Sequence, residues 1–263
     1  MSREIRNSSV LITGASSGIG YATALECAKL GARLGLAARR EERLERLAEE
    51  IRALGAQVYY LVTDVADEAQ VRRFVEQGIE HFGKVDVLIN NAGYGMRAPM
   101  EATSPEEYLQ LLQVNLMGAF YGIRVVLPHM KARRSGHIIN VSSVAGVRAM
   151  PQSGAYSSTK FAMNGMSEAL RLELAGYSIN VSIVLPISTS TEFFTVASHK
   201  PGKPAKPTGP VQSAEHVARC IVRCIRKPRP EVYAYPPARL LHALNALWPG
   251  VVDQYVKRFL VPS

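Results

Sequence analysis

The chain has 263 residues, of which 47% are hydrophobic and 20% are charged. This composition excludes disordered, collagen-like and coiled-coil proteins. No run reaches the roughly 18 uninterrupted apolar residues that a membrane-spanning helix needs, and the charged N-terminus lacks an apolar leader. Three cysteines are too few for a disulfide framework. We therefore expect no membrane span and a reducing, cytoplasmic location.

Positive charge is concentrated in the C-terminal half of the chain. Residues 1–130 carry 14 basic and 16 acidic side chains, whereas residues 131–263 carry 17 and 6. A basic surface can serve nucleic acid, an anionic membrane or a small anionic molecule. The basic residues are not interleaved with aromatic ones, and no nucleic-acid motif is present. We expect the charge to serve solubility and a phosphate-bearing cofactor, with no nucleic-acid partner.

Seven short apolar runs alternate with longer segments of helical periodicity, as βαβ units require. The strand-like runs are Ser9–Thr13, Arg33–Ala38, Gln57–Thr63, Asp86–Asn90, His137–Val141, Ser178–Leu185 and Glu231–Tyr235. The helical segments are 18–30, 40–54, 67–82, 104–133, 154–175 and 213–226. This order predicts one Rossmann-type, doubly wound α/β domain over residues 1–263, whose seven-stranded parallel sheet has helices on both faces.

Two segments lie outside this alternation. Residues 198–210 are rich in proline, glycine and lysine, which predicts a mobile surface loop within a substrate loop at 192–212. Residues 236–263 contain two amphipathic pieces separated by Pro249-Gly250 and form a helical C-terminal extension. Three roles stay open for this extension: covering a pocket, contacting another subunit, or lying shallowly on a membrane.

A glycine-rich turn follows the first strand and opens the first helix. It reads Gly14-Ala15-Ser16-Ser17-Gly18-Ile19-Gly20. Backbone N–H groups at a helix N-terminus bind phosphate, and glycine lets a pyrophosphate approach closely. Glycines can also serve tight packing of a strand against a helix. The position between strand and helix favours dinucleotide binding.

The turn and several further motifs, in order and spacing, resemble the short-chain dehydrogenase/reductase family from about Ser9 to Pro236. The motifs are Asp64-Val65, Asn90-Asn91-Ala92-Gly93, Asn115, Ser142-Ser143, Tyr156-x-x-x-Lys160 and the segment Pro186 to Thr191. The resemblance implies an enzyme that moves hydride between a nicotinamide cofactor and a carbonyl or secondary alcohol. It also implies that the cofactor contacts Gly14, Ser16, Ser17, Gly18, Ile19, Gly20, Arg39, Arg40, Asp64, Val65, Asn91, Ala92, Gly93, Tyr156, Lys160, Pro186, Thr189 and Thr191.

The end of the second strand indicates which nicotinamide dinucleotide is preferred. Enzymes of this fold that prefer NAD usually place an acid there, but this chain has Ala38 followed by Arg39 and Arg40. Guanidinium groups bind a 2′-phosphate well, so we expect NADP(H) rather than NAD(H), although the arginines could simply begin a solvated helix. The resemblance implies that Asp64 bonds the adenine amino group and Asn91 lies against the adenosine ribose.

The reacting groups are expected at Tyr156 and Lys160, which are four residues apart and so share one helix face. A nearby ammonium and an oxidised nicotinamide would lower the pKa of the tyrosine and suit it to general acid–base work. The resemblance implies that Ser143 holds the carbonyl oxygen. It also implies that Asn115 kinks its helix and anchors a water that relays protons to Lys160.

The substrate pocket is expected to be mostly apolar. We place in its walls Tyr94, Met96, Val144, Met150, Pro151, Gln152, Ile187, Phe193 and Phe194. Ile187 stands where many family members have glycine, which leaves the pocket's shape open. Lys200, Lys203 and Lys206 could meet an anionic group or simply be solvated. The substrate is therefore expected to be a lipophilic carbonyl compound or secondary alcohol.

The remaining expectations concern metals and partners. The six histidines form no cluster with metal-ligand spacing, and Cys220 and Cys224 suit packing on a helix, so no catalytic metal is expected. Family resemblance implies a homodimer or homotetramer formed through 104–133 and 154–175. The alternative to an enzyme is a catalytically silent NADP(H)-binding sensor or scaffold.

Overall fold

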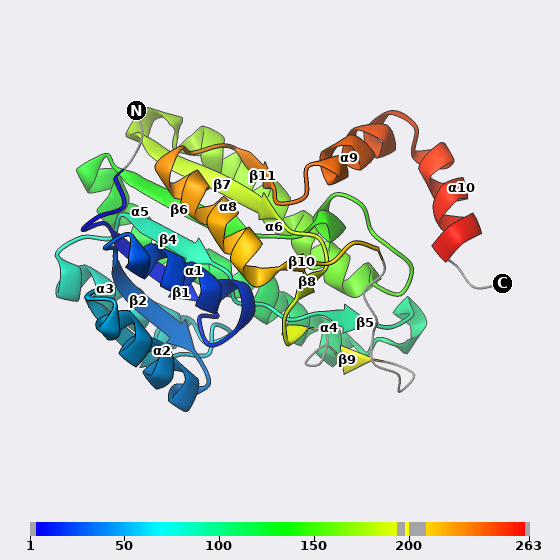
Figure 1. Ribbon diagram of the computed structural model, residues 1–263. Helices are drawn as coiled ribbons and strands as arrows, with labels where there is room; N and C mark the ends of the chain where they lie inside the picture. The colour runs from blue at the N-terminus through cyan, green and yellow to red at the C-terminus, as the bar shows by residue number, and fades with distance from the viewer. Residues whose placement is uncertain (1–3, 194–197, 200–208, 261–263) are drawn as a thin grey trace.

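The computed structural model describes residues 4–193, 198–199 and 209–260. Its main sheet has seven parallel strands in the order β11-β7-β6-β4-β1-β2-β3 (Figure 1). The strands are β1 (Ser9–Thr13), β2 (Arg33–Ala38), β3 (Val58–Val62), β4 (Val87–Asn90), β6 (Gly136–Val141), β7 (Ile179–Leu185) and β11 (Glu231–Tyr233). This confirms the predicted doubly wound parallel sheet.

Helices cover both faces of the sheet (Figure 1). One face carries α1 (Gly18–Lys29), α2 (Glu41–Ala53) and α8 (Ala214–Arg226). The other carries α3 (Glu68–Phe82), α5 (Gly118–Arg133) and α6 (Gly154–Glu173). Alternation along β1 feeds both cores, because Val10 and Ile12 face the first group while Leu11 faces the second. Both sides of the sheet are therefore buried, as the near-continuous apolar strands predict.

The segment predicted as one helix over 104–133 has a different internal geometry. It begins with α4 (Pro105–Leu112), which a capping box between Ser104 and Glu107 starts. A π-helical stretch, Gln113–Met117, then joins α4 to α5. Such wide turns are rare and often mark functional sites, and this one carries Asn115.

The same helical run bears on the membrane expectation. By length and apolar composition Pro105–Arg133 would suffice as one membrane-spanning helix, and 39% of its most apolar window is buried inside the structure. The apolar residues of α5 that lie inward, such as Ile123, Val126 and Met130, pack in the core beneath the sheet.

Short elements cluster beyond the carboxyl ends of the strands. β5 (Met96–Arg97) pairs with β9 (Ser198–His199), and β8 (Thr189–Ser190) pairs with β10 (Gln212–Ser213). Turns of 3-10 helix lie there at Met100–Ala102 and Val144–Gly146, and a third, Ala175–Tyr177, lies just before β7 at its amino end. Phe194, Lys200, Lys203 and Lys206, and most of the expected loop at 192–212, lie outside the described residues.

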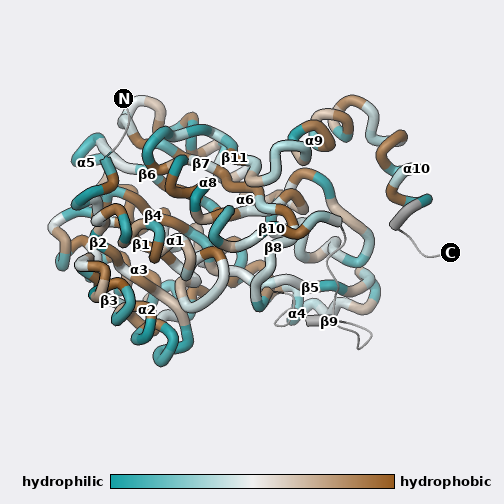
Figure 2. Tube along the Cα trace, viewed as in Figure 1, coloured by the Kyte–Doolittle hydropathy of each residue, from teal (hydrophilic) through white to brown (hydrophobic). Residues whose placement is uncertain are grey.

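The C-terminal extension forms two helices, α9 (Pro237–Leu247) and α10 (Pro249–Leu260), which reach away from the sheet (Figure 1). Arg148 ties both to the body, because its guanidinium donates to Asn245 Oδ1 at 2.9 Å and to Asp253 Oδ1 at 2.6 Å. No residue of α9 is buried, and hydrophobic residues occur along its length (Figure 2). The extension thus attaches beside the expected pocket wall at 144–152.

Candidate functional site

The glycine turn is shaped by close packing as well as by backbone conformation. Gly14 and Gly18 have φ of +66° and +58°, a region that favours glycine. A Cβ on Gly14 would come within 2.8 Å of the Ala92 Cα, and one on Gly20 would overlap the Gly14 carbonyl. The glycines therefore fit the turn closely against its neighbours, and its role in dinucleotide binding stays a prediction.

The segment after β4 braces this turn. The Asn91 amide donates to the carbonyl oxygens of Thr13 and Gly14 at 3.0 and 3.1 Å. In return, the Thr13 hydroxyl accepts from the backbone N–H groups of Asn91 and Ala92 at 3.1 and 3.2 Å. Asn90 instead bonds Asn140 inside the sheet at 2.8 Å. Thr13 is thus a bracing residue that sequence reasoning missed, because its partners are 78 residues away.

Arg40 connects the glycine turn to Glu192, which follows β8. Its guanidinium donates to the hydroxyls of Ser16 and Ser17, the latter at 2.8 Å, and to Glu192 at 2.8 Å. Arg43 also pairs with Glu192, at 2.5 Å. Arg43 and Glu192 were not predicted as site residues, although Arg43 follows Arg40 by only three residues in the sequence.

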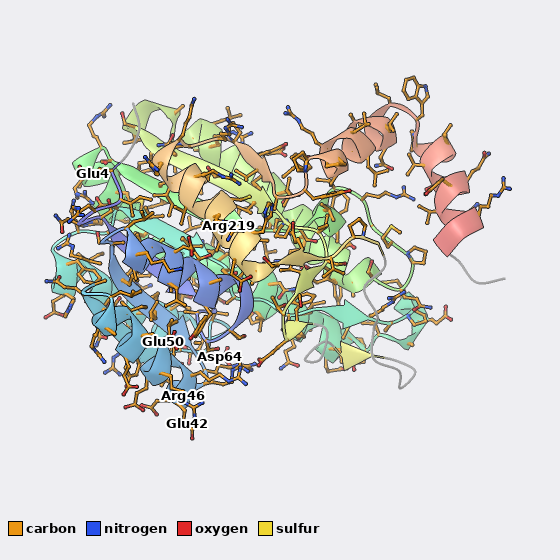
Figure 3. All side chains as sticks on the ribbon, viewed as in Figure 1. Glu4, Glu42, Arg46, Glu50, Asp64 and Arg219 are labelled. Carbon is orange, nitrogen blue, oxygen red and sulfur yellow. The ribbon has the colours of Figure 1, made fainter. Side chains whose placement is uncertain are left out.

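Arg39 and Asp64 lie at the same edge of the sheet. Arg39 is exposed, and its charge partly offsets the burial that raises the pKa of Tyr94. Asp64 follows β3 (Figure 3), where its carboxylate accepts from the Ala66 N–H at 3.0 Å. Val65 beside it is buried, and a Cβ on Gly118 would meet it. Two residues predicted to contact the adenosine end of the cofactor, Arg39 and Asp64, therefore lie at the ends of β2 and β3.

Tyr156 and Lys160 face the carboxyl edge of the sheet from the start of α6. The Lys160 ammonium lies 5.9 Å from the Tyr156 ring centroid and donates to the Val141 carbonyl at 3.0 Å. Burial raises the pKa of Tyr156 to about 12, against the opposing effect of a hydrogen bond with Ser143. Burial also lowers the pKa of Lys160 to about 8. Burial thus sets the direction of the Tyr156 pKa shift in the protein without cofactor, and the lowering expected with an oxidised nicotinamide bound stays a prediction.

The Lys160 shift makes stability depend on pH in a definite direction. The folded-state pKa lies below the unfolded value of 10.5, so the unfolded chain binds more protons between pH 8 and 10.5, and stability rises with pH there. Relative to Lys160→Met, the wild-type free energy of unfolding should rise by about 2 kcal/mol from pH 8 to 10. Urea unfolding of both proteins measures this. A difference that stays constant across that interval would contradict it.

The strand-end serines have separate positions. Ser143 caps the turn at Val144–Gly146, accepting from the Ala145 N–H at 3.1 Å, and also bonds Tyr156. Ser142 is buried, and its hydroxyl donates to the Lys160 carbonyl at 3.4 Å. Ser143 therefore lies beside the phenol, and it is the serine to which the resemblance assigns the carbonyl oxygen.

Asn115 is completely buried in the π-helical stretch. Its side-chain oxygen accepts from the Tyr94 N–H, and its amide donates to the Tyr94 carbonyl, both at 2.9 Å. The amide also reaches the Thr159 hydroxyl at 3.2 Å. A Cβ on Gly93 would lie 3.0 Å from the Asn115 oxygen and 3.7 Å from Lys160 Nζ. Asn115 thus fixes the segment after β4 against the helix that carries Lys160.

Apolar side chains surround Tyr156. Met96, Leu111 and Ala155 are buried together, with Tyr94, Tyr108 and Tyr156 packed against them. The Phe193 ring meets Tyr156 edge-on, with ring centroids 5.6 Å apart. Of the predicted walls, Tyr94, Met96 and Phe193 thus adjoin the tyrosine, whereas Leu111 and Tyr108 were missed because their helix was read without its wide turn.

The segment after β7 lies between the glycine turn and the expected pocket wall. Pro186 is buried, and its carbonyl accepts from the Val144 N–H at 3.0 Å. Thr189 donates to the Ile187 carbonyl at 2.9 Å. Thr191 lies over the glycine turn, because a Cβ on Gly18 would come within 2.9 Å of its methyl group. The predicted nicotinamide contacts therefore connect the turn to the pocket wall that contains Ile187.

These residues fit an elongated dinucleotide with phosphates at its centre. Ser17 begins α1 without capping it by its side chain, which leaves backbone N–H groups at the positive end of the helix for a phosphate. Arg40 lies at one end of the site and Tyr156 at the other. Among the described residues, no group of three or more His, Cys, Asp or Glu could hold a metal.

Known proteins are similar to this chain in sequence and in fold. A family model described as short chain dehydrogenase matches residues 8–202. An uncharacterized oxidoreductase of Listeria innocua, Lin0452, is 41% identical over 198 residues, covering 74% of this chain and 80% of that protein.

Solved structures agree. A short chain dehydrogenase/reductase from Burkholderia phymatum in complex with NAD has TM-score 0.85 and 30% identity, covering 93% of this chain and 95% of that one. An alcohol dehydrogenase from Thermococcus sibiricus complexed with 5-hydroxy-NADP has TM-score 0.75 and 31% identity, covering 87% and 94%.

Proposed function

The chain belongs to the short-chain dehydrogenase family, and from that premise we propose that it is an NADP(H)-dependent oxidoreductase interconverting a carbonyl and a secondary alcohol. The observation that carries this proposal is the meeting of Ser143, Tyr156 and Lys160 at the carboxyl edge of the sheet, beside the glycine turn. Ligands of doubly wound sheets bind at this edge.

The bound nicotinamide would supply or accept hydride. Tyr156 acts at its hydroxyl oxygen, giving a proton to the substrate oxygen in reduction and taking one in oxidation. Its raised pKa keeps the phenol protonated at neutral pH, which suits the proton-donating direction. Ser143 is hydrogen-bonded to the Tyr156 phenol. It orients the substrate oxygen and stabilises the charge that develops on that oxygen.

Lys160 and Asn115 support this proton transfer. The Lys160 ammonium is held 3.0 Å from the Val141 carbonyl, so it faces the phenol and the ribose of a bound cofactor from a fixed position. Asn115 keeps the Tyr94 backbone and Thr159 in place, which supports its role in ordering the path from Lys160. The water relay implied by the resemblance is part of this proposal.

The preference for NADP rests on the arginines after β2. Arg40 is held by Ser16 and Ser17 beside the glycine turn, where a 2′-phosphate of the adenosine ribose would lie. Ala38 occupies the position at the end of β2 where NAD-preferring enzymes of this fold usually place an acid. The solved relatives are complexes with NAD in one case and 5-hydroxy-NADP in the other, so the coarser assignment is a nicotinamide cofactor and the finer one is argued from this chain's arginines.

The cofactor preference has a direct test. Wild-type protein should bind NADPH at least tenfold tighter than NADH. Arg40→Ser should weaken NADPH about 10- to 100-fold while leaving NADH within threefold, because hydrogen bonds to charged groups contribute about 1.5–3 kcal/mol. Isothermal titration with each cofactor measures both constants. Equal affinities in the wild type would refute the preference.

The substrate is proposed to be lipophilic and the protein to be a homo-oligomer in a reducing compartment. Apolar residues of β5, α4 and the segment after β7 surround Tyr156. Exposed apolar side chains on α5 and α6, among them Phe120, Phe161 and Leu172, support contact between subunits there. All three cysteines are unpaired and buried. The alternative, a silent cofactor-binding sensor, would bind NADPH and turn over no carbonyl compound.

A further inference from the structure

We propose that Glu192 stands in for the cofactor's 2′-phosphate and thereby sets how strongly the protein discriminates NADP from NAD. This inference rests on the proposed function, because it concerns the same adenosine end of the site. The negative charge of Glu192 opposes the attraction that Arg40 exerts on the 2′-phosphate. Arg43 then also takes part in cofactor recognition.

The Glu192 carboxylate lies between two guanidinium groups. Oε2 is 2.8 Å from Arg40 Nη1, and Oε1 is 2.5 Å from Arg43 Nη1. One anionic group thus engages both arginines through separate oxygens, which is how arginine pairs bind phosphate. Arg40 immediately precedes α2 and Arg43 lies in its first turn, whereas Glu192 lies 149 residues beyond Arg43.

The position of this pair coincides with the expected phosphate site. Arg40 also donates to Ser16 at 3.1 Å and to Ser17 at 2.8 Å. The residue before Glu192 lies over Gly18, the first residue of α1. Glu192 therefore reaches the arginines at the glycine turn, where the ribose of a dinucleotide on that turn would carry its 2′ substituent.

The charges make the carboxylate a competitor of phosphate. The two arginines hold the pKa of Glu192 below its usual range, so it is anionic at neutral pH. A 2′-phosphate would have to displace Glu192 from the arginines or bind beside an uncompensated negative charge. NAD has no such group and leaves both ion pairs intact. Glu192 thus penalises NADP binding selectively.

The expected size of this effect is moderate. The side chains of Arg40, Arg43 and Glu192 are 40 to 42% exposed, and exposed ion pairs contribute little each. Removing the carboxylate charge in Glu192→Gln should tighten NADPH and 2′,5′-ADP about three- to tenfold. NADH and 5′-AMP should stay within twofold.

Glu42→Gln is the matched control. It removes the same charge from α2, but Figure 3 shows Glu42 pointing outward from that helix, so all four affinities should match those of the wild type. Arg43→Gln should weaken NADPH severalfold and leave NADH unchanged. Calorimetric titration of each purified full-length protein with the four ligands gives every constant.

The outcomes separate this inference from the proposed function. If wild-type protein binds NADPH and Glu192→Gln binds it no tighter, Glu192 is not a competitor and this inference is wrong while the function stands. The same holds if NADH tightens as much as NADPH. If neither cofactor binds wild-type protein, the proposed function fails and takes the inference with it.

Discussion

Tyr156→Phe should lower kcat by about 10²- to 10⁴-fold, the usual contribution of a general acid–base group. The substitution removes one oxygen from a side chain that bonds Ser143 and packs edge-on against Phe193. The ring and its contacts stay, so NADPH affinity should remain within threefold of the wild-type value. Nicotinamide absorbance, followed with NADPH across a panel of apolar ketones, aldehydes and diones, measures the rate.

Tyr59→Phe provides the matched comparison for this experiment. Tyr59 is in β3, and its hydroxyl donates to the Phe74 carbonyl at 2.9 Å, inside the core on the α3 side of the sheet. The same atom is removed there at a distance from the site, so turnover should not change. Full activity in Tyr156→Phe would refute its role as the proton donor. Tight NADPH binding by wild type with no turnover of any substrate would favour the sensor.

Asn115→Leu should destabilise the protein by about 2–4 kcal/mol and impair turnover as well. The leucine leaves the N–H and carbonyl of Tyr94 without their present partner, and an unsatisfied buried polar group costs about 1–3 kcal/mol. The loosened segment after β4 also borders Lys160. Urea unfolding gives the stability, and kcat measured well below the melting temperature gives the effect on the site.

Asn180→Leu controls for the chemical change in this second experiment. Asn180 is an exposed residue of β7, so its replacement should alter stability by less than about 0.5 kcal/mol. Cofactor affinity in Asn115→Leu tests whether the folded protein keeps its glycine turn. Wild-type stability and wild-type kcat together in this variant would show that the buried hydrogen bonds matter neither to the fold nor to the site.

The sequence predicted the sheet well because its signals are local. Each strand is an apolar run that ends at a polar or glycine-rich turn, and the strand bounds differ from those observed by at most two residues. The glycine turn and the four-residue spacing of Tyr156 and Lys160 were also read from local pattern, whereas Ser143 was assigned by family resemblance, and the roles of all of them stay predictions. The two-residue strands β5 and β8 were missed, since each depends on a partner far along the chain.

The contacts that tune the site were beyond local reasoning. Glu192 meets Arg43 across 149 residues, and no periodicity indicates such a pairing. The expected lowering of the Tyr156 pKa depends on a bound oxidised nicotinamide as well as on Lys160, whereas in the protein without cofactor burial raises this pKa. Burial is a property of the whole packed site, and Phe193, which covers the ring, is 37 residues further on.

The wide turn at Gln113–Met117 has a consequence for how this helical run can vary. A regular helix fixes the angular position of every residue relative to every other. Here the extra residue resets that relation: Leu111 before it packs toward the tyrosine cluster, and Ile123 after it packs beneath the sheet. The helical run from α4 through α5 is therefore continuous, but the residues before the wide turn and those after it pack against different parts of the protein. Substitutions before the wide turn should therefore act on the cluster around Tyr156, whereas substitutions after it should act on the core.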